Sequence, residues 1–128
     1  MKFKIEGLQH IGIPTKKYKE TLAFYNELGF KSVHENIQPS GGKVCFLSKN
    51  TLMLEIYESD EAEINCAGPI NHFALDSSDI DLSYMAAVEN KMKIITKGIE
   101  SLDFWEKGIK YFIIEGPNKE RVEICQKL

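Results

Sequence analysis

The sequence predicts an α+β fold built from two βαβββ modules, and three observations support this prediction. One short segment recurs near the start of each half, and another recurs near the end of each half. Between them, each half contains one stretch with helical periodicity and three shorter extended stretches. We therefore expect modules at residues 1–62 and 68–128, with the joint between Glu61 and Pro69, paired into curved mixed sheets within a single domain.

The segments that open the two halves match position by position. Leu8-Gln9-His10-Ile11-Gly12-Ile13 and Ile70-Asn71-His72-Phe73-Ala74-Leu75 both read apolar, side-chain amide, histidine, apolar, small, apolar. The closing segments, Leu54-Glu55-Ile56-Tyr57 and Val122-Glu123-Ile124-Cys125, both place a glutamate between two apolar residues. Each half thus begins with a strand that carries a histidine and ends with a strand that carries a glutamate.

In the first half, a helix is expected after the opening strand. Tyr18, Leu22 and Tyr25 recur at helical spacing, and Gly29 stands where a glycine commonly ends a helix. Extended segments are then expected over residues 31–36, 44–47 and 52–57, with a polar turn at residues 48–50.

The second half repeats this order. Asp79 is a candidate N-cap, and Ile80, Tyr84 and Val88 form an apolar stripe that ends near Asn90. Extended segments are expected over residues 93–97, 111–114 and 121–125, with a turn at Gly-Pro-Asn 116–118.

Composition excludes several classes of protein. The chain has 128 residues, 43% of them hydrophobic and 27% charged, with a net charge of −3, and its lysines are scattered, so we expect no nucleic-acid partner. No apolar run approaches a membrane span, and the start lacks the pattern of an export signal, so we expect no membrane partner. Cys45, Cys66 and Cys125 are odd in number and widely spaced, so we expect no disulfide framework and a cytoplasmic location.

Four residues form a candidate metal site: His10, Glu55, His72 and Glu123. Because side chains alternate across a strand, each lies on the face opposite its apolar neighbours, which we expect to pack against a helix. A solvent-facing polar sheet surface would explain each glutamate singly, and an ancestral site that has lost its metal would explain all four residues. Their repetition favours one divalent ion, either Ni, Co, Zn, Mn or Fe, held by two imidazoles and two carboxylates.

The chain resembles the vicinal oxygen chelate superfamily, which includes glyoxalase I, extradiol dioxygenases, fosfomycin-resistance transferases, methylmalonyl-CoA epimerase and bleomycin-binding proteins. The resemblance covers essentially the whole chain and lies in residues 10–13, in Thr-Leu-Ala-Phe-Tyr-Asn-Glu-Leu-Gly-Phe 21–30, and in Gly-Pro-Asn-Lys-Glu-Arg-Val-Glu-Ile 116–124. It implies the glyoxalase-like fold. It also implies that the two histidines and two glutamates occupy the four metal positions, a set most similar to glyoxalase I.

The resemblance implies a reaction as well. A metal with open positions would chelate two neighbouring oxygens of a small α-oxo or hemithioacetal substrate and stabilise an enediolate. Glu123 or Glu55, detaching from the metal, would act as the catalytic base. The chain has a single arginine, Arg121, whereas relatives that use glutathione usually recognise its carboxylates partly through arginines, so the thiol is left open. Alternatives are a metal-dependent epimerase, a fosfomycin-type thiol transferase and a non-catalytic drug-binding protein.

Further residues are candidates for contact with a small-molecule substrate. The Phe-Trp pair stands in an expected loop, where it fits core packing and a substrate wall equally well. Cys125 shares the face of Glu123, although a small buried thiol is the simpler explanation. His34 has no counterpart in the second half and is expected on the surface. We expect a homodimer, with each site built within one chain or across two. The substrate-binding candidates are Phe46, Met53, Phe104, Trp105 and Cys125.

Overall fold

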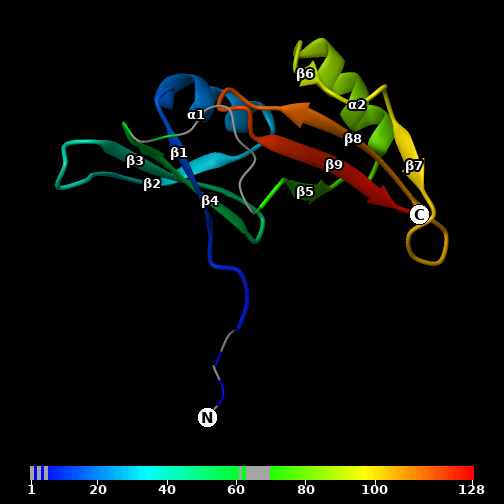
Figure 1. Cartoon of the computed structure of the whole chain (residues 1–128), viewed down its shortest axis with the longest axis horizontal. Coiled ribbons are helices and arrows are strands. Elements are labelled where there is room, and N and C mark those ends of the chain that lie inside the picture. Colours follow the sequence, from blue (N-terminus) through cyan, green and yellow to red (C-terminus); the bar gives the residue numbers. More distant parts are fainter. Residues whose placement is uncertain (1, 3, 5, 61, 63–69) are drawn as a thin grey trace. The chain divides into compact units, whose positions relative to one another are not determined.

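The computed structural model describes residues 2, 4, 6–60, 62 and 70–128 (Figure 1). The chain divides into two compact units, Met1–Glu63 and Ile64–Leu128, and the described residues of each form one sheet and one helix. Both sheets combine parallel and antiparallel pairs, so the α+β class expected from the sequence is confirmed. Of the joint expected between the modules, at residues 61–69, only Ala62 lies within the described residues.

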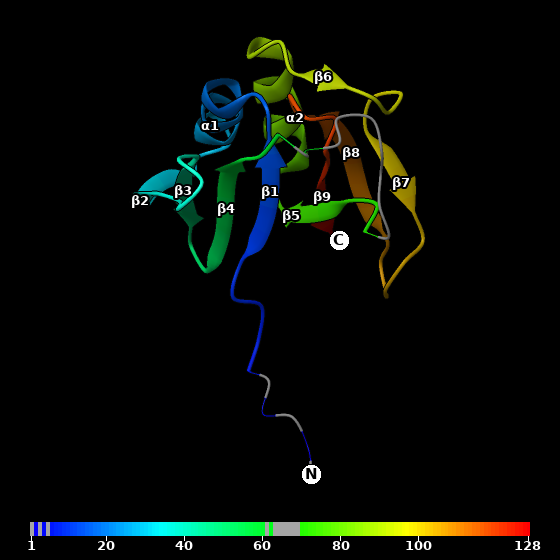
Figure 2. The ribbon, with the colours of Figure 1, turned by 60° about the vertical axis from the view of Figure 1, so that its left-hand side comes forward.

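The first unit follows the expected βαβββ order. Its elements are β1 (Ile11–Thr15), α1 (Tyr18–Glu27), β2 (Lys31–Ile37), β3 (Lys43–Lys49) and β4 (Leu52–Glu58). The strand order is β1-β4-β3-β2, with β1 parallel to β4 and the other pairs antiparallel; β1 and β4 are seen side by side in Figure 2. The first and last strands of this unit, β1 and β4, are therefore direct neighbours in its sheet.

The core of the first unit lies between α1 and the sheet. Helix α1 packs against β4, where Leu54 and Ile56 are fully buried. Tyr25 of α1 is also fully buried, and its ring meets Phe30 edge-on with 5.8 Å between the ring centroids. Burial of each such side chain contributes about 1.5–3 kcal/mol, so this core fixes which face of β4 turns away from the helix.

The second unit repeats this arrangement with one additional strand. Its strand order is β5-β9-β8-β6, with β5 parallel to β9, and the short strand β7 pairs with β8. In Figure 1, α2 lies beside the sheet that contains β8 and β9, and it contacts both of these strands. The elements are β5 (Phe73–Asp76), α2 (Ile80–Glu89), β6 (Lys93–Ile94), β7 (Glu100–Leu102), β8 (Ile109–Glu115) and β9 (Arg121–Lys127).

Two expectations for the second unit are wrong. The strand expected over residues 93–97 is only Lys93–Ile94. A further strand, β7, was not expected; β6 pairs with one end of β8 and β7 pairs with the other. Val88 is 52% exposed, although it was assigned to the apolar stripe of the helix. Ala87 is buried instead, since seven residues past Ile80 complete almost two helical turns of about 3.6 residues each.

The turns from strand to helix repeat in atomic detail. After β1, the hydroxyls of Thr15 and Thr21 lie 3.1 Å apart, and the Lys17 amide donates to Thr15 Oγ1 at 2.8 Å. After β5, the hydroxyls of Ser77 and Ser83 lie 2.7 Å apart, and the Asp79 amide donates to Ser77 Oγ. Matching hydroxyl pairs therefore set the entry into both helices.

Asp79 acts as the N-cap of α2, as the sequence predicts. Its carboxylate Oδ1 accepts a hydrogen bond from the Leu82 amide at 3.1 Å. The side chain of Gln126 joins this end of the helix to β9, because it accepts from the Ile80 amide and donates to the Ser78 carbonyl.

Among the described residues, no helix is long and apolar enough to cross a membrane.

Candidate functional site

The first unit brings His10 and Glu55 together. His10 stands one residue before β1, whereas the sequence placed it within the strand, and Glu55 lies in the middle of β4. His10 Nε2 is 3.9 Å from Glu55 Oε1, and both side chains are partly exposed. Two ligands of one metal ion, each bonded at about 2.0–2.2 Å, can span such a distance.

The sheet presents Glu55 on the face opposite the helix. Leu54 and Ile56 on either side are fully buried, while Glu55 itself is half-buried, as strand alternation requires. Gly12 and Phe46 are its partners on the adjacent strands. A Cβ at Gly12 would lie 3.6 Å from Glu55 Oε1, so the small residue at this position leaves room beside the carboxylate.

The second unit repeats this geometry around Glu123. Ala74 and Ile113 are its strand partners, and Val122 and Ile124 beside it are buried against the opposite face. Ala74 therefore corresponds to Gly12 as the small residue next to the glutamate. His72 stands before β5, which begins at Phe73, and its side chain is exposed.

Each unit thus offers one imidazole and one carboxylate. Within the described ranges, no group of three or more His, Cys, Asp and Glu side chains is close enough to hold a metal ion. The donor types nevertheless fit a borderline divalent cation, for which imidazole nitrogen and carboxylate oxygen are preferred ligands. Each unit by itself therefore supplies two of the four candidate ligands.

Phe46, a substrate-binding candidate, lies between two histidines on the face of Glu55. Its ring centroid is 5.7 Å from that of His10 and 6.0 Å from that of His34. His34 is exposed, as expected, but its position beside Phe46 was missed because strand pairing, not sequence order, brings it there. Met53 is half-buried and two residues before Glu55, so it shares the same face.

Cys125 shares the face of Glu123, two residues further along β9. Tyr111 is its partner on β8, and the Tyr111 hydroxyl donates to Glu100 Oε2 at 2.9 Å. This hydrogen bond, followed by partial burial and the charges of Glu100 and Glu123, raises the pKa of Tyr111. Burial, followed by the charges of Glu123 and Asp76, raises the pKa of the Cys125 thiol.

Tyr111 and Glu100 were missed by the sequence analysis. Glu100 lies on the unexpected strand β7, and Tyr111 joins the face of Glu123 only through the register between β8 and β9. The two-residue period of a strand, counted from Ile113 opposite Glu123, would have placed Tyr111 on this face. Within the described residues, Cys45 and Cys125 are free thiols, and Cys66 lies outside that part of the chain.

Phe104 and Trp105 lie between β7 and β8. Their side chains are 53% and 70% exposed, so neither ring belongs to the core of the second unit. Lys127 Nζ is 4.8 Å from the centroid of the Trp105 ring, within the range of a cation–π contact. This contact ties the loop to the end of β9, the strand that carries Glu123.

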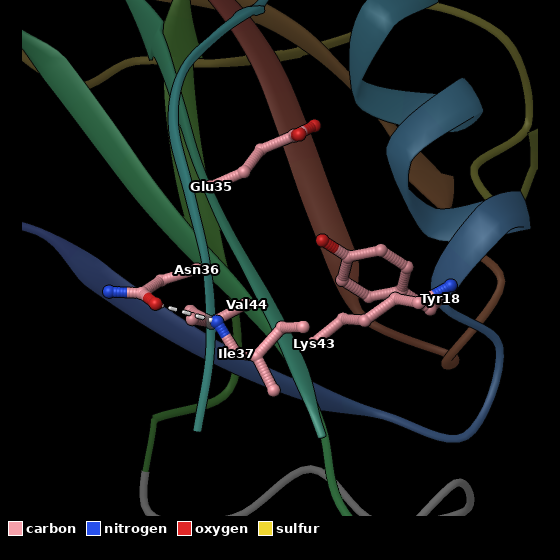
Figure 3. A pocket seen from close by; sticks show the side chains of 6 residues that line it. All are labelled: Tyr18, Glu35, Asn36, Ile37, Lys43 and Val44. Carbon is pink, nitrogen blue, oxygen red and sulfur yellow. Dashed lines mark hydrogen bonds between the residues drawn. The ribbon is translucent and has the colours of Figure 1, made fainter. Parts of the chain in front are cut away.

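The first unit also has an open pocket of about 410 Å³ that is separate from the His10 and Glu55 pair. Figure 3 shows its lining residues, with the Asn36 side chain accepting from the Ile37 amide at 2.8 Å. Burial, followed by Cys45, Glu35 and Glu58, raises the pKa of Tyr18 to about 12. None of the metal-ligand candidates is among the lining residues, which are Tyr18, Glu35, Asn36, Ile37, Lys43 and Val44.

The family of the chain is shown by a match that spans most of its length. A model of the Glyoxalase/Bleomycin resistance protein/Dioxygenase superfamily matches residues 7–124. The chain therefore belongs to that superfamily, the vicinal oxygen chelate proteins, as its sequence motifs indicated.

Several known proteins are similar to the chain over nearly its whole length. The uncharacterized protein YwbC of Bacillus subtilis is 27% identical over 125 residues, which cover 94% of this chain and 97% of that protein. A glyoxalase family protein from Enterococcus faecalis has a TM-score of 0.80 at 23% identity, covering 96% of this chain and 99% of that chain. The fosfomycin resistance protein FosX of Listeria monocytogenes, crystallised with Mn(II) and sulfate, has a TM-score of 0.73 at 16% identity, covering 97% and 94%.

Proposed function

We propose that the chain is a metal-dependent lyase or isomerase of the glyoxalase type, acting on a small α-oxo or hemithioacetal substrate. The observation that carries this proposal is the repetition of one histidine and one glutamate in equivalent positions of both units. A pure binding protein has no need of two carboxylates turned away from two helix-packed cores. Members of the superfamily bind divalent metals, as the Mn(II) complex of FosX illustrates.

His10, Glu55, His72 and Glu123 would hold one divalent ion, and residues 1–128 would then form a single functional domain. When bound, the ion supplies Lewis-acid polarisation of a substrate carbonyl. The protein's own part is the proton transfer between adjacent carbons, with the Glu123 or Glu55 carboxylate accepting the proton from one carbon and returning it to the next. A carboxylate suits both steps because it can accept the proton and then release it from the same position on its strand.

The substrate would lie on the same sheet faces as the glutamates. Phe46 and Met53 provide apolar surface beside Glu55, and Cys125 lies beside Glu123. Phe104 and Trp105 would form a wall of the substrate site at the end of β9, near Lys127. We further propose a cytoplasmic homodimer, in which the two units that complete a site come from one chain or from two copies.

A fosfomycin-type resistance enzyme is a second candidate. FosX has been solved both with Mn(II) and sulfate and, as the E126Q variant, with Mn(II) and 1S,2S-dihydroxypropylphosphonic acid. The likeness at 16–18% identity extends to the fold, with TM-scores of 0.72–0.73, so either reaction is compatible with it. A drug-binding protein without catalysis is the candidate of a different class.

Metal content per chain tests the site. The protein is purified without chelator or affinity tag and analysed for metals, together with His10→Ala, His72→Ala and the control variant His34→Ala. We expect about one metal ion per chain in the wild type and in His34→Ala, with a large loss in the other two. Absence of metal in the wild type, even after incubation with Ni, Co, Zn and Mn, would favour the binding protein.

A substrate panel then separates the enzymes. Hemithioacetals of several thiols, epimerisable thioesters and fosfomycin with water or thiols are offered to the metal-loaded protein. Turnover of a hemithioacetal that disappears in Glu123→Gln and Glu55→Gln supports the glyoxalase-type reaction. Modification of fosfomycin alone would replace it with the second candidate.

A further inference from the structure

The residue before each candidate histidine carries a side-chain amide that contacts the imidazole. Gln9 Oε1 is hydrogen-bonded to His10 Nδ1. Asn71 Oδ1 is 3.0 Å from His72 Nδ1. The same contact therefore occurs in both units, at the same nitrogen of the ring.

This contact determines where the imidazole proton lies. A carbonyl oxygen of an amide only accepts, so the bond requires Nδ1 to carry the proton. A neutral imidazole has one ring proton, and Nε2 is then left with a free lone pair. In the first unit this nitrogen is the atom that lies 3.9 Å from Glu55 Oε1.

We infer that Gln9 and Asn71 are positioning residues that hold His10 and His72 in the Nδ1–H form, with Nε2 available to bind the metal. The metal-binding part of this inference rests on the proposed function. Unbonded histidine favours the opposite form, with the proton on Nε2, so each amide reverses the intrinsic preference. The amide that precedes the histidine in each repeated segment thus has a physical role.

The recurrence argues against a chance contact between neighbours. Glutamine and asparagine differ in length by one methylene, and yet both bring the amide oxygen to the same ring nitrogen. Metal-binding histidines generally donate their second ring N–H to an oxygen acceptor, which fixes both the tautomer and the ring orientation. The chain contains three histidines, and the third, His34, follows Val33, whose side chain has no acceptor.

The tautomers can be read directly by NMR. Long-range ¹H–¹⁵N spectra are recorded on the metal-free full chain above the pKa of imidazole, where three well-separated ring systems are expected. We expect His10 and His72 with the proton on Nδ1, and His34 with it on Nε2. Gln9→Leu and Asn71→Leu should each convert only their own neighbour to the Nε2–H form, while Gln9→Glu and Asn71→Asp, which keep an acceptor, preserve it.

Metal affinity provides a second measurement. Competition against a chromophoric chelator should show binding of Zn or Ni weakened about 10–100-fold in Gln9→Leu and Asn71→Leu. The exposed helical amide Asn26 provides the control, because Asn26→Leu should leave affinity unchanged. The acid variants should recover most of the loss.

The outcomes separate this inference from the proposed function. Wild-type histidines in the Nε2–H form, or leucine variants with unchanged tautomer and affinity, would overturn the positioning role while leaving the metal site intact. The expected tautomers in a protein that binds no metal would support the positioning role and overturn the metal-dependent function.

Discussion

Gly29 and Lys91 occupy the same left-handed backbone position after the two helices, with φ angles of 94° and 54°. The next residue closes each helix in the same way, since the Phe30 amide donates to the Tyr25 carbonyl and the Met92 amide to the Ala87 carbonyl. Glycine adopts this conformation freely, whereas lysine is strained by its Cβ. The second unit thus lacks the glycine that relieves the first.

We predict that Lys91→Gly stabilises the protein by about 0.5–1 kcal/mol, because removal of the strain outweighs the greater freedom of the unfolded chain. Gly29→Ala should destabilise it by about 1 kcal/mol, since it introduces the same strain. Urea unfolding measures both. Glu89→Gly, two residues earlier within α2, should be destabilising, and a loss of stability in Lys91→Gly as well would contradict the explanation.

Metal binding should stabilise the folded protein by an amount that grows with the logarithm of the free metal concentration divided by Kd. At a free metal concentration of 100 times Kd, the free energy of unfolding should rise by about 2.7 kcal/mol over the chelator-treated protein. Glu123→Gln should lose most of this gain, while Glu89→Gln on the surface of α2 should keep it. Thermal unfolding against metal concentration gives the measurement, and equal gains in both variants would argue that the ion binds elsewhere.

The phenol of Tyr18 should lose its proton at a higher pH than an ordinary tyrosine. Burial and nearby charges raise its pKa to about 12, so its phenol stays protonated when an ordinary tyrosine ionises near 10. A raised pKa in the folded state means that the contribution of Tyr18 to stability is present below pH 10 and is lost as the pH rises towards 12. The difference in phenolate absorbance between wild type and Tyr18→Phe gives the midpoint, and Glu35→Gln should lower it.

Cys125 should react slowly with alkylating reagents at neutral pH. Burial, with the charges of Glu123 and Asp76, raises the pKa of its thiol, and only the thiolate is nucleophilic. The pH midpoint of iodoacetamide labelling, followed by mass spectrometry of the Cys125 peptide, should therefore lie above that of a free cysteine. Glu123→Gln and Asp76→Asn should each lower the midpoint only partly, since burial is the largest cause.

Much of this fold can be predicted from the sequence because the two units repeat the same local patterns of apolar, polar and capping residues. The alternation of Leu54, Glu55 and Ile56 predicts a strand with one buried face, and the structure has this burial. Asp79 identifies the start of α2 for a comparable reason, since its carboxylate bonds to the helix backbone. Local periodicity and capping carry such information directly.

Features that depend on strand pairing were not predictable in this way. Strand β7 exists because β8 offers an edge to Glu100–Leu102, and the Tyr111 to Glu100 hydrogen bond follows from that pairing. His34 joins Phe46 through the register of β2 and β3. Val88 shows a further limit, because an eight-residue spacing suits a helical stripe less well than seven.

The contact between Trp105 and Lys127 gives the protein a built-in optical probe. Trp105 is the only tryptophan of the chain, and the ammonium of Lys127 is 4.8 Å from its ring centroid. Lys127 lies four residues beyond Glu123 on the same strand, about 13 Å along it. Indole emission therefore reports, without any added label, on charge or solvent changes at the end of the strand that carries Glu123.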